Sequence, residues 1–184
     1  PEGVSDGVVR GLYKMRGTDQ PKIRLLGSGP LMREVLAAAE LLKEDWGIEP
    51  GIWNVTSFSE LRREAEAVER WNLTHPDETP RVSYVEELLS KNTVPTVAVS
   101  DYIKLVSDQI RPYVPGPYYC LGTDGFGRSD TREGLRRFFE VDRYYVVLTA
   151  VKALVHAGEL EAGMVDAVLE KYGLDPEKPN PVTV

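Results

Sequence analysis

The residues best suited to chemistry lie in a glycine-rich segment, 122–130, between a predicted strand and a predicted helix. Three glycines flank Asp124 and Phe126 in this segment, and Arg128 and Asp130 follow. Ligands of open α/β sheets bind beyond the carboxyl ends of the strands, so one interpretation is a loop that contacts a ligand or a partner. The other interpretation is a tight turn whose glycines adopt positive φ. The sequence leaves both open.

A second glycine-rich turn, Gly27-Ser28-Gly29-Pro30, also lies between a predicted strand and a predicted helix. Helix N-termini attract anions, so this turn could hold a phosphate. It lacks the G-x-G-x-x-G spacing and the lysine of a P-loop. Because any α/β protein needs a tight turn between strand and helix, the structural interpretation is favoured.

The chain has few candidates for a nucleophile or a base. Cys120 lies in the strand-like run Tyr118–Leu121, which predicts a buried, inert thiol. His156 ends a predicted helix, where the free carbonyls favour a positive group. His75 precedes Pro76 and could orient a carboxylate or a neighbouring chain, but a local hydrogen bond in a rigid turn is the favoured interpretation. No Ser-His-Asp or Cys-His arrangement is visible.

Composition limits the classes of function. The chain has 184 residues, 42% of them hydrophobic, which fits one globular domain. Its net charge of −7, from 29 acidic and 22 basic side chains, argues against a nucleic-acid surface. Apolar stretches are too short to cross a bilayer. A single cysteine excludes an intrachain disulfide and fits a reducing cytoplasm.

The amino terminus shows neither a signal peptide nor an initiator Met, since the sequence begins Pro1-Glu2-Gly3. We therefore expect either that something was removed or that the chain is a piece of a longer protein.

Hydrophobic spacing predicts strands alternating with helices, and hence an α/β fold with a mainly parallel sheet. The predicted strands are 22–26, 51–55, 96–99 and 118–121, with an entering strand within 7–15. Four predicted helices have both bounds: 31–46, 103–110, 144–155 and 164–172. Two more are predicted by their starts alone, one at Ser57 and one at Asp130 with Glu133. The second of these is expected to bury Leu135, Phe138 and Phe139. Residues 71–80 are predicted as a polar loop, and 82–89 are ambiguous, since their start could be a strand and their end a helix. We divide the chain into an entering strand and linker (1–21), one α/β domain (22–174) and a loose tail (175–184).

Several motifs together resemble the terminal domain of the homodimeric bacterial pyruvate dehydrogenase component. They include Gly122-Thr123-Asp124-Gly125-Phe126-Gly127-Arg128-Ser129-Asp130, Val55-Thr56-Ser57-Phe58-Ser59-Glu60-Leu61, Glu69-Arg70-Trp71-Asn72 with His75-Pro76, and Leu25-Leu26-Gly27-Ser28-Gly29. The resemblance covers essentially the whole chain in order. It implies a transketolase-type carboxy-terminal domain, a three-layer α/β/α sandwich on a five-stranded mixed sheet with one antiparallel strand.

The resemblance also implies an activity for the parent enzyme, which decarboxylates pyruvate on thiamine diphosphate and transfers the acetyl unit to a lipoyl group. The family holds the diphosphate and its magnesium with a Gly-Asp-Gly motif and a downstream Asn. Gly122-Thr123-Asp124-Gly125 only superficially resembles that motif, and no suitable Asn follows. We therefore assign no catalytic, cofactor-binding or metal-binding residue to this chain.

Two classes of function follow. The first is a structural and assembly domain whose partners are the preceding domains, a second copy of the enzyme and the acetyltransferase core. The second is a free-standing α/β module that binds an anionic ligand at the glycine-rich turns. For the first class the candidate docking residues are Asp124, Phe126, Arg128, Asp130, Trp71 and His75.

Overall fold

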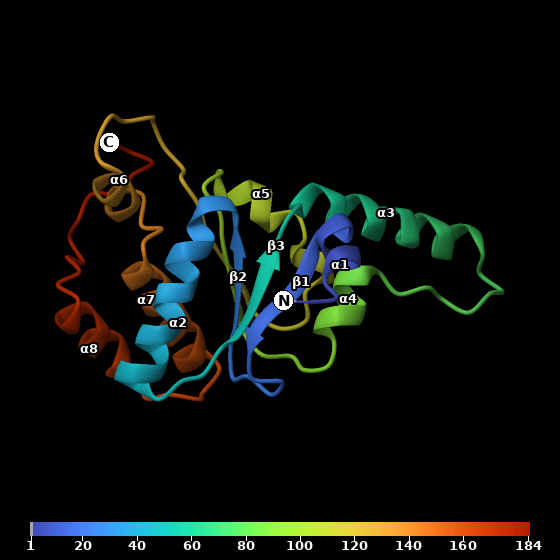
Figure 1. Ribbon diagram of the computed structural model, residues 1–184, viewed down its shortest axis with the longest axis horizontal. Coiled ribbons are helices and arrows are strands. Elements are labelled where there is room, and N and C mark those ends of the chain that lie inside the picture. The colour runs from blue at the N-terminus through green and yellow to red at the C-terminus, as the bar shows by residue number, and fades with distance from the viewer. Residues whose placement is uncertain (1) are drawn as a thin grey trace.

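A five-stranded sheet forms the centre of the molecule. In the computed structural model, which describes residues 2–184, the strand order is β1-β3-β2-β4-β5 (Figure 1). The strands are β1 (Leu12–Gly17), β2 (Arg24–Ser28), β3 (Gly51–Val55), β4 (Thr96–Val99) and β5 (Tyr118–Leu121). β1 pairs antiparallel with β3 at one edge of the sheet, and the other pairs are parallel. The predicted mixed sheet with one antiparallel strand is confirmed.

Helices cover both faces of the sheet, as a parallel sheet requires. One face carries α2 (Met32–Trp46), α7 (Arg143–His156) and α8 (Met164–Lys171), and the other carries α3 (Phe58–Thr74), α4 (Tyr84–Leu89) and α5 (Lys104–Asp108) (Figure 1). The short elements are α1 (Ser5–Arg10), η1 (Gly29–Leu31), η2 (Arg111–Tyr113) and α6 (Arg132–Phe138). Successive residues of the central strand serve both layers: Leu25 packs into the first and Leu26 into the second, and both are fully buried.

The connections change face at β2. The chain leaves β2 through α2 on one face, and leaves β3 through α3 and α4 on the other, before it returns as β4. The carboxyl ends of β2 and β4 therefore lie at the point where the strand order reverses. Open α/β sheets place their functional crevice there.

Two predicted segments fold differently because of local capping. Residues 82–89 contain no strand: Ser83 caps α4, and its side chain and that of Glu86 form a reciprocal capping box. Residues 7–15 begin as the helix α1 and become a strand only at Leu12, because Gly11 at φ 101° ends the helix.

The bounds of β2, the start of α6 and the burial of its side chains also differ from prediction. β2 spans 24–28 rather than 22–26, since Gly27 and Ser28 pair with β3. α6 is capped by Thr131, whose hydroxyl accepts from Gly134 N, rather than by Asp130. None of the α6 side chains predicted to be buried is fully so, and they are half-buried instead.

The tail 175–184 forms no helix or strand but makes specific contacts. Lys178 Nζ donates to Phe138 O at 2.8 Å. Pro181 is buried, and its carbonyl lies so close to Gly125 that a Cβ there would approach it to 2.3 Å. The tail therefore crosses the glycine-rich loop that follows β5.

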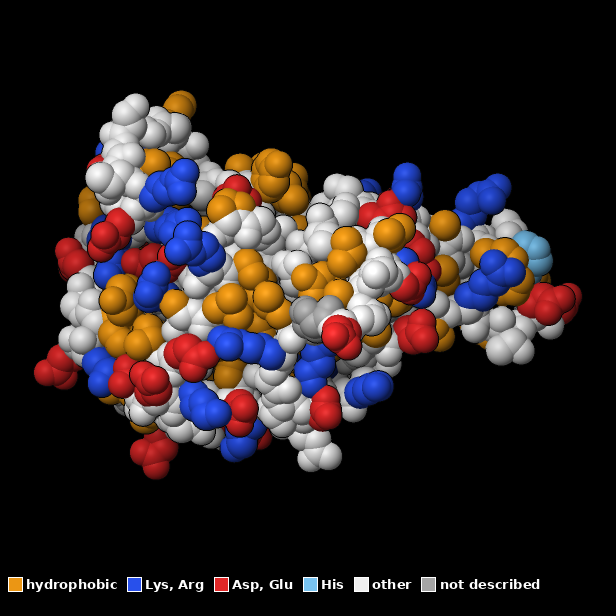
Figure 2. Space-filling model, in the orientation of Figure 1, with side chains coloured by type: hydrophobic (Ala, Val, Ile, Leu, Met, Phe, Trp, Pro, Cys, Tyr) orange, Lys and Arg blue, Asp and Glu red, His pale blue; other side chains and the backbone are white. Residues whose placement is uncertain are grey.

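Of the segment 71–80 predicted as a polar loop, residues 71–74 belong to α3 and 75–80 form the loop; residues 71–82 together form an arm that projects from the body (Figure 1). The Trp71 ring has the His75 ring stacked at 4.4 Å and the Arg81 guanidinium 3.7 Å from its centroid. The side chain of Asn72 makes two hydrogen bonds to the backbone of Arg81, at 2.8 and 2.9 Å. These contacts fold the loop back on the helix. In Figure 2 the arm lies at the far right, marked by its histidine.

We expect Arg81→Ala to loosen the arm without unfolding the protein. Loss of the guanidinium removes an exposed cation–π contact of about 0.5–1 kcal/mol, which is local to the arm. Hydrogen exchange at residues 76–82 should become faster while the melting temperature changes little. Arg63→Ala, an exposed change on the same helix, is the control and should leave this exchange as it was. Unaltered exchange in Arg81→Ala would show that the stack does not hold the arm.

Candidate functional site

A cavity of about 540 Å³ opens at the carboxyl ends of β2, β4 and β5, at the crevice that the topology predicts. Its apolar wall comes from Leu31, Leu135, Phe139 and Val141. Its charged residues are Asp101, Arg128, Arg132 and Arg136. The cavity thus combines an apolar wall with a mostly cationic rim.

The turn after β2 does not suit a phosphate. Gly29 has φ 55°, and a Cβ built there would lie 3.2 Å from Asp101 Oδ1. An anion at this turn would therefore meet a carboxylate, which repels it. Gly27 has a packing role, because a Cβ there would approach Met32 Sδ to 2.5 Å. The structural interpretation of this turn is the one the geometry supports.

The loop 122–130 carries four of the six candidate docking residues, and two of these accept hydrogen bonds from backbone N–H groups outside the loop. Asp124 Oδ2 accepts from Lys104 N at 3.0 Å and so caps the start of α5 from the neighbouring loop. Asp130 Oδ1 accepts from Thr131 N at 2.6 Å, just before α6. Both carboxylates therefore hold local structure.

The other two residues of this loop point outward. Phe126 is 77% exposed, so it does not fold into the core of this domain. The Arg128 guanidinium lies over the Phe138 ring, 4.1 Å from its centroid. Trp71 and His75 are not part of this cluster, because they stack on each other in the arm.

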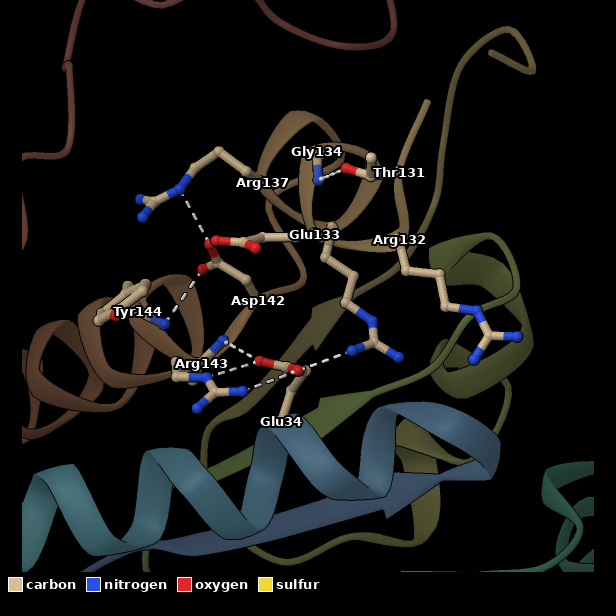
Figure 3. Close-up of a pocket in the computed structure, with 10 residues that line it drawn as sticks. Glu34, Thr131, Arg132, Glu133, Gly134, Arg137, Asp142, Arg143 and Tyr144 are labelled. Carbon is tan, nitrogen blue, oxygen red and sulfur yellow. Dashed lines mark hydrogen bonds and ion pairs between the residues drawn. The ribbon is translucent and has the colours of Figure 1, made fainter. Parts of the chain in front are cut away.

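Sequence reasoning missed a second cavity, of about 740 Å³, between α2, α6 and the start of α7 (Figure 3). At its base the nearly buried carboxylate of Glu34 accepts from Arg136 Nη1 at 2.8 Å and from Arg143 Nε at 3.0 Å. The backbone N–H of Arg143 donates to the same carboxylate at 3.1 Å. No local signal marks Glu34, because its partners lie 102 and 109 residues away in the sequence.

Two carboxylates in this cavity have pKa values shifted in opposite directions. Burial opposes ionisation of Glu34, but the hydrogen bonds and charges of Arg143 and Arg136 outweigh it and lower its pKa. Burial raises the pKa of Asp142, which caps α7 through Tyr144 N and Tyr145 N and pairs with Arg137 at 3.0 Å. Glu34 and Asp142 are both engaged with arginines and backbone N–H groups, so these two carboxylates connect α2, α6 and α7.

The remaining chemical candidates are Cys120 and His156. Cys120 is half-buried beside Asp108, and burial raises its thiol pKa to about 11, so it is a neutral thiol near pH 7. His156 Nδ1 lies 3.2 Å from the Tyr119 hydroxyl. Within residues 2–184, no three His, Cys, Asp or Glu side chains gather closely enough to hold a metal ion. No helix in the described part of the chain is long and apolar enough to cross a membrane.

The described residues do not fit thiamine diphosphate with its magnesium. A hard cation needs several oxygen ligands in one place, and Asp124, the acid of the Gly-Asp-Gly-like sequence, already caps α5. We therefore derive no catalytic step through that coenzyme in this chain.

We expect Glu34→Gln to destabilise the 184-residue chain by about 1–3 kcal/mol at pH 7, since it leaves two arginines without their charged partner. Because the folded-state pKa of Glu34 is lowered, its contribution is complete above the ordinary glutamate pKa of about 4.3 and is lost as pH falls through the lowered value. Urea unfolding of wild type and Glu34→Gln at pH 7, 5 and 3.5 should show the difference between their unfolding free energies shrinking as the pH falls.

Glu40→Gln is the matched control for this prediction. Glu40 lies on the same helix and pairs with Arg16 at 2.6 Å, but both side chains are about half exposed. Its loss should cost less than about 1 kcal/mol. A difference between wild type and Glu34→Gln that stays constant from pH 7 to 3.5 would contradict the assigned role of the carboxylate.

Comparison with known proteins gives close relatives over the whole chain. The pyruvate dehydrogenase E1 component of Cupriavidus necator is 52% identical over 188 residues, covering 100% of this chain and 21% of that protein. The proteins of the same description from Pseudomonas aeruginosa and Escherichia coli K12 are 50% and 46% identical, over 99% and 98% of this chain. The chain spans about one fifth of the length of these relatives.

Solved structures agree on the fold. Transketolase from Leishmania mexicana matches 85% of this chain and 20% of its own with a TM-score of 0.57 at 18% identity, and a transketolase complex from Pichia stipitis matches 82% and 19% with a TM-score of 0.55 at 19% identity. At these identities the likeness concerns the fold alone. The family model of the transketolase-like TK C-terminal domain matches residues 11–142, most of the chain. Together with the mixed sheet of that fold, this match shows that the chain belongs to the transketolase-like C-terminal domain family.

Proposed function

We propose that this chain is the carboxy-terminal domain of a thiamine-diphosphate-dependent pyruvate dehydrogenase, the E1 component of a pyruvate dehydrogenase complex. The observation that carries the proposal is identity of 46–52% with three such proteins over at least 98% of the chain. The parent enzyme decarboxylates pyruvate oxidatively and transfers the acetyl unit to lipoyl groups. This domain contributes structure and assembly.

The site chemistry supports a role without catalysis for the domain itself. Glu34 and Asp142 are bound by arginines and backbone N–H groups, and the Cys120 thiol has a raised pKa. The coenzyme and magnesium then belong to the rest of the parent protein. The absence of a fitting oxygen-ligand set among residues 2–184 is consistent with that division.

The proposed partners follow from the parent enzyme. They are the preceding domains of the same polypeptide, a second copy of the enzyme in a homodimer, and the acetyltransferase core of the complex. A cytoplasmic location fits the single cysteine, because disulfides are rare in reducing compartments.

The test compares the complete protein with the 184-residue chain. We expect the complete protein to release carbon dioxide from pyruvate when thiamine diphosphate and Mg²⁺ are present, and the chain alone to release none. Isothermal titration of the chain with thiamine diphosphate and Mg²⁺ should give no saturable heat, since it lacks the ligands for a hard cation. A micromolar site on the chain, or a complete protein inactive on pyruvate, would overturn the proposal.

A further inference from the structure

The exposed apolar side chains are distributed unevenly over the molecule. Ten large ones are exposed within residues 2–184, and only Leu73 and Val82 of these belong to the arm. Six others lie where the carboxyl ends of the parallel strands meet, and we call them the carboxyl-edge face: Val8, Val9, Tyr102, Ile103, Leu105 and Phe126. The last two, Val182 and Val184, are in the tail that crosses Gly125 at this edge.

The opposite edge, where the parallel strands begin, exposes no such apolar side chains among the described residues. The loops there are 18–23, 47–50, 90–95, 114–117 and 157–163, and none of the ten residues lies in them. Lys22 instead pairs with Glu159 across two of these loops at 3.0 Å. Large apolar side chains exposed at one end of the strands and not at the other favour a surface that another body covers. Figure 2 shows hydrophobic side chains clustered over α5 at the upper rim of the molecule.

The direction of β1 brings the amino terminus to this same edge. β1 is antiparallel to β3, so its first residue, Leu12, lies opposite the last residue of β3, Val55. The backbone of Gly11 accepts from Thr56 N at 2.9 Å, and Val8 O accepts from the Thr56 hydroxyl at 2.8 Å. α1, with Val8 and Val9, is thereby fixed beside the turn that follows β3. Polypeptide preceding this domain would reach it at the carboxyl edge.

The charges of this edge add a chemical requirement. Arg128 and Arg132 line the cavity there, and neither forms an ion pair within residues 2–184. Nearby, Asp124 and Asp130 are already bound to backbone N–H groups. A body seated on this edge would therefore need apolar side chains for Leu105 and Phe126, and a carboxylate for the arginines.

We propose that the part of the polypeptide that precedes this domain in the same chain packs on the carboxyl-edge face. That part would supply apolar side chains to the face and a carboxylate to its arginines. This proposal rests on the proposed function, in which about four fifths of the parent protein lies outside this chain. Five strands at roughly 4.8 Å spacing span about 19 Å, so one domain tethered at α1 can cover the edge from Val8 to Phe126. A second copy of the enzyme is the alternative occupant.

The test uses the complete enzyme with one cysteine placed in this domain, either Leu105→Cys or the control Ala162→Cys. Both positions are exposed in the isolated fold, but Ala162 lies at the opposite edge. Iodoacetamide labelling, quantified for each peptide by mass spectrometry, should be at least about tenfold slower at position 105, because a covering domain must open first. A thiol-to-amine cross-linker at position 105 should join lysines of the preceding part of the same chain.

Each other result overturns the proposal. Equal labelling rates would show that the face is free. Slow labelling with cross-links between two chains, seen as a band of twice the mass, would assign the face to a second copy. Slow labelling without any cross-link outside this domain would show that the preceding part of the chain does not contact this face. Pyruvate decarboxylation measured on the same samples keeps the two claims apart: an active enzyme with a free position 105 retains the proposed function and loses only this inference.

Discussion

The contact of Glu34 with Arg136 and Arg143 fixes α6, the helix that follows the glycine-rich loop after β5. α6 has seven residues and no fully buried side chain, so neither its length nor its packing would hold it in one place. α2, by contrast, packs firmly on β2 and β3 through buried residues such as Val35 and Ala38. The Glu34 carboxylate binds Arg136 of α6 and Arg143 at the start of α7, and so holds both to α2. The loop that carries Phe126 and Arg128 is consequently held at both ends, by β5 and by α6.

Acidic and basic side chains serve different purposes around this loop. The carboxylates of Asp124, Asp130 and Asp142 accept from backbone N–H groups, because the starts of α5, α6 and α7 each present N–H groups that need acceptors. The arginines point across the surface, where Arg128 covers the Phe138 ring. A chain with a net charge of −7 therefore has a cationic rim at one edge of its sheet.

Local patterns in the sequence predicted the fold where local interactions decide it. The strands 51–55, 96–99 and 118–121 have the predicted bounds, since β-branched and aromatic runs have few alternatives in an α/β layer. Ser57 caps α3 as its spacing to Glu60 predicts. The same spacing occurs at Ser83 and Glu86, where it marks the start of α4. Polar residues and prolines after Trp71 predicted a loop, yet the stack on His75 and Arg81 extends the helix to Thr74.

The candidate site was less accessible to sequence reasoning because its key contacts join distant segments. Glu34 lies on a helix with many charged residues and nothing distinguishes it locally, whereas its partners follow more than a hundred residues later. The resemblance to a family supplied the mixed sheet and its antiparallel strand, which periodicity alone could not specify. The resemblance could not indicate which carboxylates are hydrogen-bonded to arginines or backbone N–H groups, since that depends on where each helix starts in space.

The glycines after β5 illustrate how one loop can satisfy both interpretations that the sequence left open. Gly122 is needed for packing, because a Cβ there would approach Lys104 N to 2.6 Å. Gly125 has φ 118° and lies against the Pro181 carbonyl, so it too serves the fold. Gly127, however, has no atom within 4 Å of a built Cβ, and Phe126 beside it is mostly exposed. The first half of the loop is thus explained by this domain alone. The second half leaves a large apolar side chain in water, so the free energy of burying it is available to a surface that covers this loop.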